Sequence, residues 1–362
     1  MTTVTAPAAP PGAGTAGIRK ARGGGFWRYL LVRFLLIFPT IFILVTLVFF
    51  LMRLTGDPIT ASLGDRLTAE QLAERIHAAG YDRPIMVQYL EYLGQIFVGN
   101  FGSSITDGRP ITEILWTYGS ATLELVFYSL IVAFIVGIPL GMVAAYFRDR
   151  WGDASLRVFA ILCYATPVFF AGLVLKLIFS VWLKWLPVAG RASTRTEIKL
   201  QQLDDPTGIY LIDAIRTGSG AAVGDVLAHA VLPALALGLL TAGVFLRLVR
   251  TNVIGTLSRD YVDAARSRGV SEFRLVRKHA LKPALVPIIT VIGLQIAMLL
   301  GGAVLTETTF EWKGLGFQLA EYLAKRDFVA VQGIVALLAV IVALTNFIVD
   351  IVAAILDPRV RY

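Results

Sequence analysis

The sequence predicts an all-α polytopic membrane protein with six transmembrane helices. The first observation is composition: of the 362 residues, 56% are hydrophobic and only 16% are charged, whereas soluble domains average about 45–50% and about 25%. The second is a mean hydropathy of +0.71, and the third is a series of long apolar runs separated by polar loops. A chain this apolar has too little polar surface to cover a soluble core. This excludes a soluble enzyme, a disordered protein and a nucleic-acid-binding domain.

Six apolar runs are each long enough to cross about 30 Å of hydrocarbon as a helix. The first follows residues 1–25, a stretch rich in Ala, Pro, Gly and Thr that we expect to be a disordered cytoplasmic tail. This run is about 20 residues long and no small-residue cleavage site follows it, so we expect an uncleaved first transmembrane helix over residues 26–51. Residues 119–362 then form a transmembrane domain with five further helices. The six runs cover roughly residues 30–51, 119–146, 155–183, 227–249, 284–305 and 331–356.

The charges of the loops predict the orientation of the chain across the membrane. One set of loops carries 19 Lys and Arg against 6 Asp and Glu, and the other carries 13 against 17. The first set comprises the N-terminal segment, residues 147–157, residues 247–283 and the tail from Asp357. The second comprises residues 52–118, 184–226 and 306–330. Because Lys and Arg accumulate in cytoplasmic loops, we expect the first set and both termini to be cytoplasmic. The net charge of +8 is then a sign of topology, and we expect no nucleic-acid partner.

The loop over residues 52–118 is too long for a simple turn and predicts a small extracytoplasmic helical insertion. A helix is expected over 67–79, with Thr68 as its N-cap, Gln71 completing a capping box and Gly80 ending it. A second helix is expected to share one apolar face, formed by Met86, Tyr89, Leu90, Leu93 and Phe97. The other long outer loop, 184–226, carries no motif that we can interpret.

Three charged residues lie well inside the predicted spans: Glu124, Lys176 and Asp350. Charges within a membrane are costly and are by default a functional hypothesis. Glu124 and Lys176 both fall in the outer halves of their helices, so one expectation is that they form an ion pair. The three charges would then have a gating or a structural role. The alternative is that each side chain extends to the nearest interface. Asp350 lies near the cytoplasmic end of the last span, where we expect it to pair with a basic group.

The cytoplasmic loop over residues 250–283 carries the most informative segment. Residues 259–270 predict a short helix in which Ala264 and Ala265 form a small, flat face. Gly269 is placed to end this helix in a left-handed conformation, and Ser271 to cap the next one. Such a helix is suited to docking on a cytoplasmic partner, with Tyr261 and Val262 as apolar anchors and Arg266 and Arg268 as charges for an acidic rim. The alternative is a basic loop without a partner.

These residues resemble a known family. Asp263-Ala264-Ala265 followed by Gly269 is similar to the EAA-loop signature of the permease subunits of binding-protein-dependent ABC importers. Further motifs resemble the B-type subunit of the peptide/nickel (dipeptide/oligopeptide) permease branch. They are Arg28-Tyr29, Asp57-Pro58, Asp82-Arg83-Pro84 with Gln88-Tyr89, Ala121-Thr122-Leu123-Glu124-Leu125, Gly137-Ile138-Pro139-Leu140-Gly141, Glu307-Thr308-Thr309-Phe310, Gly314-Leu315-Gly316, Asp327-Phe328, Val331-Gln332-Gly333, Asp350 and Leu356-Asp357-Pro358-Arg359-Val360-Arg361-Tyr362.

The resemblance covers nearly the whole chain from Phe26, and its ordered set of motifs is more specific than any one of them. The chain departs from the signature in two places: Asp263 stands where the family has Glu, and Pro283 lacks the strict Ile-x-Leu-Pro spacing. The segment from His279 to Leu285 is instead similar to the variant found in peptide permeases. The Gly-rich N-terminal tail is not part of the pattern.

The resemblance implies a type I ABC importer permease fold and the function of a transmembrane permease subunit. Di- or oligopeptides are the first expected substrate, with nickel or another small solute as the alternative. It also implies that residues 258–272 form the coupling helix. The ATPase-coupling residues are then Tyr261, Asp263, Ala264, Ala265, Arg266 and Gly269.

The implied partners are a homologous second permease, two cytoplasmic ABC ATPases, an extracytoplasmic substrate-binding protein and the lipid bilayer. The chain itself has no Gly-x-x-x-x-Gly-Lys-Ser/Thr loop, so we expect it to hold no cofactor, with ATP and Mg²⁺ bound by the ATPases. It is expected to lie in a bacterial cytoplasmic membrane.

Two functions of other classes are less well supported. A membrane-embedded enzyme needs a catalytic cluster, but His77, His229 and His279 fall in separate parts of the predicted topology and cannot readily form one metal site. The lone Cys163 forms no disulfide within the chain, and its apolar neighbours favour a small buried side chain. An ion-coupled transporter usually has more charges within the membrane and internal repeats.

Overall fold

The computed structural model describes residues 25–54, 56–64 and 66–356, and this part of the chain is almost wholly helical with no named strand. Five helices are long and apolar enough to cross a membrane. They are α1 (Gly25–Arg53), α5 (Ile111–Tyr146), α10 (Gly220–Leu257), α13 (Leu281–Phe310) and α15 (Phe328–Leu356). The expected tail at residues 1–25 lies outside the described residues apart from Gly25, and so does the terminal motif after Leu356.

The sixth predicted span is broken into two helices. α6 (Trp151–Ala165) is followed by α7 (Val168–Leu175), which continues as the π-helical stretch η1 (Lys176–Trp182). The two halves meet at an angle of 106°. The expectation of one continuous helix over 155–183 is therefore wrong. The reason is local: Pro167 disfavours helical geometry in the residue before it, and Thr166 is extended, with φ −79° and ψ 125°.

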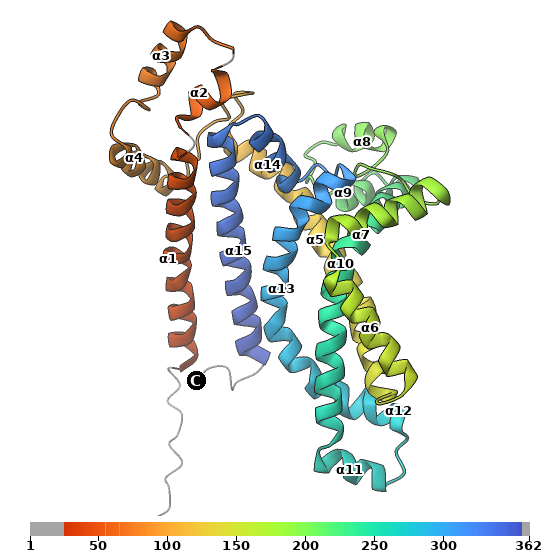
Figure 1. Cartoon of the computed structure of the whole chain (residues 1–362). Coiled ribbons are helices and arrows are strands. Elements are labelled where there is room, and N and C mark those ends of the chain that lie inside the picture. Colours follow the sequence, from red (N-terminus) through yellow and green to blue (C-terminus); the bar gives the residue numbers. More distant parts are fainter. Residues whose placement is uncertain (1–24, 55, 65, 357–362) are drawn as a thin grey trace, which may run out of the picture.

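The centre of the bundle is the contact between α5 and α10, which run side by side along much of their length (Figure 1). Glycines make this close approach possible. A Cβ atom on Gly137 would lie 2.8 Å from the carbonyl oxygen of Ala242, and one on Gly141 would lie 2.6 Å from the Cβ of Val249. Gly137 and Gly141 flank Pro139 in the sequence, and their role in the fold is to let two backbones meet.

Replacing Gly141 with leucine is expected to destabilise the helix bundle by about 1–3 kcal/mol, the usual cost of overpacking a well-packed core. The matched control is Gly255→Leu on α10, because no atom lies within 4 Å of the Cβ position there. Thermal unfolding of the purified chain in detergent measures the difference. Equal melting temperatures for the two variants would show that the α5–α10 contact is looser than the structure has it.

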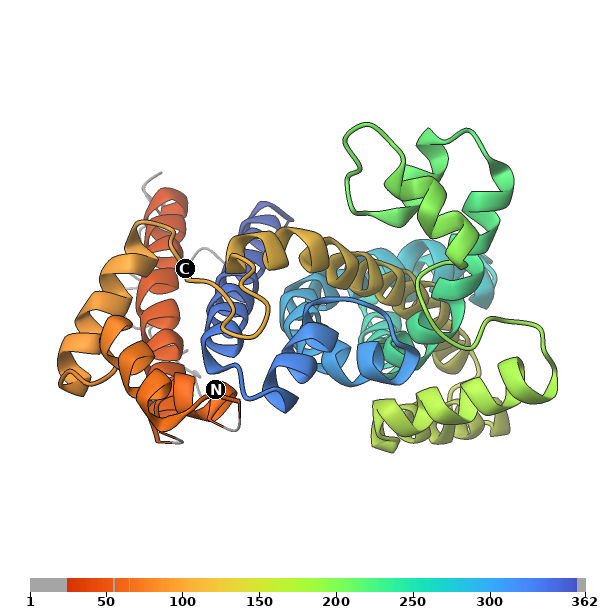
Figure 2. The same ribbon diagram turned by 90° about the horizontal axis from the view of Figure 1, so that it is seen from above.

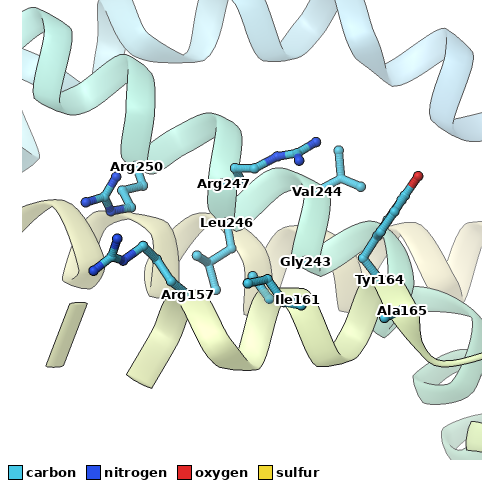
Figure 3. Close-up of a pocket in the computed structure, with 10 residues that line it drawn as sticks. Arg157, Ile161, Tyr164, Ala165, Gly243, Val244, Leu246, Arg247 and Arg250 are labelled. Carbon is cyan, nitrogen blue, oxygen red and sulfur yellow. The ribbon is translucent and has the colours of Figure 1, made fainter. Parts of the chain in front are cut away.

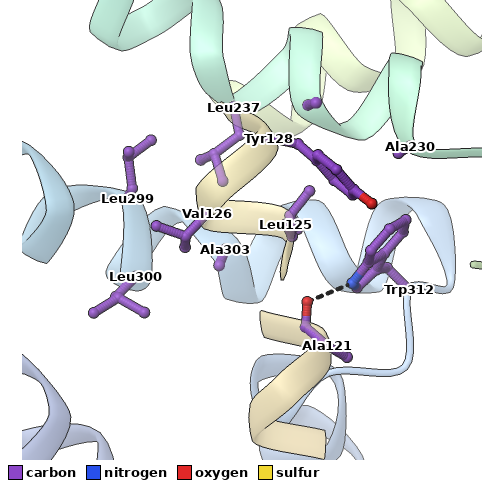
Figure 4. Close-up of a cluster of buried hydrophobic side chains, with 11 residues drawn as sticks. Ala121, Leu125, Val126, Tyr128, Ala230, Leu237, Leu299, Leu300, Ala303 and Trp312 are labelled. Carbon is purple, nitrogen blue, oxygen red and sulfur yellow. Dashed lines mark hydrogen bonds between the residues drawn. The ribbon is translucent and has the colours of Figure 1, made fainter. Parts of the chain in front are cut away.

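A hydrophobic cluster joins α5 and α10 to α13 (Figure 4). Leu125, Leu237 and Leu299 come from these three helices and are almost wholly buried. Trp312, in the segment after α13, closes the cluster and donates its indole N–H to the carbonyl oxygen of Ala121 at 2.9 Å. The polar end of this large side chain is thereby satisfied inside an apolar core.

Helix α1 lies at one edge of the bundle beside α15, and the bent α6–α7 pair lies at the opposite edge (Figure 2). Many large apolar side chains of α1 are exposed, among them Leu35, Phe38 and Leu47. Such a surface is suited to contact with lipid, since a chain in a bilayer does not need to hide apolar side chains from water. α1 begins, and α15 ends, at the same end of the bundle (Figure 1).

The insertion after α1 contains three short helices at the other end of the bundle (Figure 1). They are α2 (Pro58–Leu63), α3 (Ala69–Ala78) and α4 (Ile85–Phe97). The capping box predicted for Thr68 and Gln71 is present. Gly80 has the predicted positive φ, +72°.

In α4, the predicted apolar stripe is divided between two environments. Tyr89 is buried and its hydroxyl lies 2.6 Å from that of Thr46 on α1. Met86, Leu90 and Phe97 are exposed on the outward side. The helix is held inward through Tyr89 and Gln88, whose amide group donates to two backbone carbonyl oxygens, so most of the stripe faces away from the bundle.

The loop over residues 184–226, in which the sequence showed no motif, also contains helices. α8 (Thr194–Gln201) and α9 (Tyr210–Arg216) precede the long α10. Between α13 and α15 lies α14 (Leu315–Ala324).

The insertion over residues 52–118 is held to the rest of the bundle through Asp327. This side chain is fully buried and accepts hydrogen bonds from the hydroxyl groups of Ser104 (2.8 Å) and Thr106 (3.0 Å).

Candidate functional site

The short helix predicted over residues 259–270 is α11 (Asp260–Ser267), and it projects beyond the other helices at the end of the bundle where α1 begins (Figure 1). Gly269 ends it with φ +80°, a conformation that side chains with a Cβ rarely adopt. The chain then continues through α12 (Glu272–Arg274) and the π-helical η2 (Leu275–Ala280) directly into α13. Ser271 precedes α12 as predicted, but its side chain makes no capping hydrogen bond.

Contacts on two sides hold α11 in place. Val262 is fully buried against the chain, and the hydroxyl of Tyr261 donates to the carbonyl oxygen of His279 at 3.3 Å. Arg266 is engaged by two carboxylates, Asp263 at 2.5 Å and Glu272 at 2.7 Å. The bonds to Glu272 and then the charge of Asp263 raise the pKa of Arg266 above its ordinary value. The helix is thereby fixed to the segment that leads into α13.

These contacts change the roles predicted for two side chains, Val262 and Arg266, and leave two others, Tyr261 and Arg268, as expected. Val262 is buried within its own chain, so it is not available as an anchor for a partner. Tyr261 is 48% exposed, so it is accessible as an anchor for a partner. Arg266 already forms ion pairs with Asp263 of its own helix and with Glu272. Arg268 is exposed and has no ion-pair partner among the described residues. Ala264 is exposed and Ala265 half-buried, which leaves a small, flat surface facing outward.

Glu124 does not pair with Lys176, as the sequence had suggested, but with Arg191. The Glu124 carboxylate and the Arg191 guanidinium lie 2.5 Å apart, and their side chains are only 2% and 5% exposed. Arg191 belongs to the loop after η1, and its charge lies 3.6 Å from the centre of the Tyr210 ring. We missed Arg191 because a single arginine in a polar loop carries no signal of burial.

The carboxylate of Glu124 is fully satisfied by further hydrogen bonds. Tyr128 donates its hydroxyl from the next turn of α5 at 2.8 Å. The backbone N–H of Leu211 donates at 2.9 Å and that of Tyr210 at 3.3 Å. Since α9 begins at Tyr210, the charge also lies at the N-terminal end of that helix. Glu124 thus fixes the loop that carries Arg191 and Tyr210 to α5.

Lys176 has a separate partner. Its ammonium group donates to the carbonyl oxygen of Thr309 at 2.9 Å and lies 5.8 Å from the centre of the Phe310 ring. These residues form the C-terminal end of α13, where unpaired carbonyl oxygens attract a positive charge. Lys176 therefore ties the bent helix pair to the C-terminal end of α13, and the predicted Glu124–Lys176 pair is wrong.

A second buried carboxylate, Glu307, lies close to this region and was quoted only as part of a motif. It is fully buried and accepts hydrogen bonds from Thr122 at 2.6 Å and from the backbone N–H of Phe317 at 2.8 Å. Cβ atoms added to Gly314 or Gly316 would lie within 3.0 Å of its carboxylate. The Gly-Leu-Gly motif after α13 therefore makes room for this side chain.

Two further ion pairs join long helices to one another. Asp350 on α15 is 3.4 Å from Arg33 on α1, which confirms the expectation that it pairs with a basic group. Asp153 on α6 is fully buried and accepts two hydrogen bonds from Arg250 on α10, at 2.5 and 2.6 Å. The sequence did not show this second pair, because its members are far apart along the chain.

The described residues contain no group of three or more His, Cys, Asp and Glu side chains placed to hold a metal ion. His77 bonds Asp82 in the insertion, at 2.6 Å, and His229 bonds the carbonyl oxygen of Asp225, at 2.8 Å. Cys163 is half-buried on α6, more accessible than we had expected.

Comparison with known proteins identifies the family. Residues 137–362 match the family described as "Binding-protein-dependent transport system inner membrane component". Residues 26–112 match the description of its N-terminal part, "Binding-prot-dependent transport system membrane comp, N-term". The chain belongs to this family. It is a transport subunit and not an enzyme, and it is a multi-pass membrane protein.

Relatives of this permease carry more specific names. The chain is 38% identical over 329 residues to the "Di/tripeptide transport system permease protein DppB" of Pseudomonas aeruginosa, covering 90% of this chain and 96% of the relative. It is 36% identical over 337 residues to the "Dipeptide transport system permease protein DppB" of Escherichia coli, covering 92% and 99%. It is 39% identical over 309 residues to the "Probable D,D-dipeptide transport system permease protein DdpB" of E. coli, covering 84% and 88%.

Proposed function

We propose that this permease imports di- or oligopeptides across a bacterial cytoplasmic membrane, as a subunit of an ATP-driven importer that works by alternating access. The names of relatives that match over nearly their whole length support the substrate class. The observation that carries the mechanism is α11, a helix that extends beyond the bundle (Figure 1). Its Ala264 is exposed and its Ala265 half-buried, and it is held to the chain through Val262 and Arg266.

The proposed assembly contains a second homologous permease, two cytoplasmic ATPases and an extracytoplasmic substrate-binding protein. ATP and Mg²⁺ belong to the ATPases. Both termini are cytoplasmic in this proposal, which the distribution of Lys and Arg supports. α11 projects from the end of the bundle where α1 begins and α15 ends, consistent with this orientation (Figure 1).

In this proposal α11 is the coupling helix. Closure of the ATPases would push on the exposed face around Ala264 and Arg268. Because Val262 is buried and Arg266 is bonded to Glu272, the helix would move as a rigid body with the segment that enters α13. The Asp153–Arg250 pair would carry the motion from α10 to α6. Such a movement of rigid helices is a common way to switch between two states.

Uptake by the complete importer tests the substrate class. Proteoliposomes that contain both permeases, the ATPases and the binding protein are expected to accumulate a radiolabelled dipeptide when ATP is supplied. Unlabelled di- and tripeptides are expected to compete with it, and Ni²⁺ is not. Uptake of ⁶³Ni²⁺ without uptake of peptide would refute the peptide assignment while leaving the role of α11 open.

A further inference from the structure

A cavity of about 330 Å³ opens between α6 and α10 toward the inner end of the bundle (Figure 3). Its walls are largely apolar, with Ile161 from α6 and Val244 from α10. Three arginines line it as well: Arg157, Arg247 and Arg250. In Figure 3, Arg157 and Arg250 lie together at one end and the side chain of Tyr164 at the other.

The positive charge of this cavity is only partly balanced. The carboxylate in contact with these arginines is that of Asp153. Arg250 donates hydrogen bonds to both of its oxygens, at 2.5 and 2.6 Å. Arg157 lies farther from the same carboxylate, at 3.7 Å. Arg247 is exposed and has no ion-pair partner among the described residues. The lining of the cavity therefore carries three guanidinium groups against one carboxylate, and the cavity favours an anion.

The depth of the arginines agrees with the level of lipid headgroups. α6 begins at Trp151, which is 91% exposed, and tryptophan is enriched at the membrane interface. Arg157 lies six residues farther along, about 9 Å at 1.5 Å per residue. Ile161 and Tyr164 lie one to two turns deeper again. The end of the cavity with Arg157 and Arg250 is thus cationic near the interface, and Arg247 lies between this end and Tyr164, with its side chain extending toward Val244 (Figure 3).

We propose that this cavity binds an anionic phospholipid of the inner leaflet. Its phosphate would lie between Arg247 and Arg157, and an acyl chain would follow Ile161 and Val244. Basic pockets between transmembrane helices on the cytoplasmic side are suited to such headgroups. A zwitterionic peptide fits less well, because its amino group needs an acceptor and Arg250 already occupies both oxygens of Asp153.

Native mass spectrometry of the full-length chain tests this site. The chain is purified in detergent and supplied with phosphatidylglycerol or phosphatidylcholine of identical acyl chains. We expect wild type to retain phosphatidylglycerol preferentially. Arg157→Gln and Arg247→Gln are each expected to weaken retention about fivefold, the effect of one basic residue near an anionic surface. Arg247→Lys keeps the positive charge and is expected to keep most of the phosphatidylglycerol retention of wild type.

The control is Arg28→Gln, which removes an exposed charge from the start of α1 at the same end of the bundle but outside the cavity. It is expected to leave retention unchanged, and thermal unfolding is measured for every variant to confirm folding. Equal retention of the two lipids, or an equal loss in Arg28→Gln, would overturn the proposal. So would displacement of the lipid by a dipeptide, or its exclusion when the second permease is bound, because either result would assign the cavity to another occupant.

Discussion

Peptide uptake by the complete importer is expected to fall more than tenfold when Ala265 is replaced with glutamate or Gly269 with valine. Ala265 is half-buried on α11, and a longer charged side chain there prevents a close, flat contact. Gly269 has φ +80°, which a β-branched residue adopts only at a cost of about 1–3 kcal/mol. In both variants we expect normal insertion into the membrane, since neither position lies in a transmembrane helix.

The control for Ala265→Glu is Ala73→Glu, the same change on the exposed surface of α3 at the opposite end of the protein. Uptake, ATP hydrolysis and co-purification of the ATPase are measured together. The coupling-helix account expects uptake to be lost with the ATPase either released or hydrolysing ATP without transport. Full uptake in both α11 variants, with the ATPase still bound, would rule it out.

Replacing Arg191 with alanine is expected to destabilise the permease by about 3–5 kcal/mol, because it leaves the buried charge of Glu124 without its partner. Arg191→Met combined with Glu124→Gln is expected to cost less than the two single changes together, since no charge then remains unpaired. Lys176→Met is the comparison: its ammonium group bonds one carbonyl oxygen, at 2.9 Å, and its loss is expected to cost about 1 kcal/mol.

Denaturant unfolding of the purified variants measures these differences. The structure is contradicted if Arg191→Ala costs less than Lys176→Met, or if the double variant shows simple additivity. A large coupling free energy between Glu124 and Lys176 would support the ion pair that the sequence suggested. It would contradict the assignment of Arg191 as the partner of Glu124.

The long helices could be predicted from the sequence because hydropathy along one segment is enough to define a span. Hydropathy carries no information about the direction of a helix axis. The only sign of the 106° bend in the run over 155–183 was therefore Pro167. The capping box at Thr68 and the positive φ of Gly269 were also predictable, because both depend on the few residues around them.

The charged contacts were harder to predict, because their partners are distant in the sequence. Glu124 was recognised as unusual, but Arg191, its partner 67 positions later, stands in a loop that looks solvent-exposed. Asp153 and Arg250 are 97 positions apart and each falls in a basic, polar stretch. For Asp350, the position near the end of the last predicted span was sufficient to predict a basic partner, and this partner is Arg33.

Cross-linking from α11 tests the central claim most directly. In the complete importer, with Cys163 replaced by serine, Ala264→Cys places a thiol on the exposed face of α11 and Ala73→Cys places one on α3. A short thiol-to-amine cross-linker is expected to join Ala264→Cys to an ATPase subunit in high yield, with no such product from Ala73→Cys. If Ala264→Cys yields no product with an ATPase in an importer that still transports peptide, α11 is not the coupling helix.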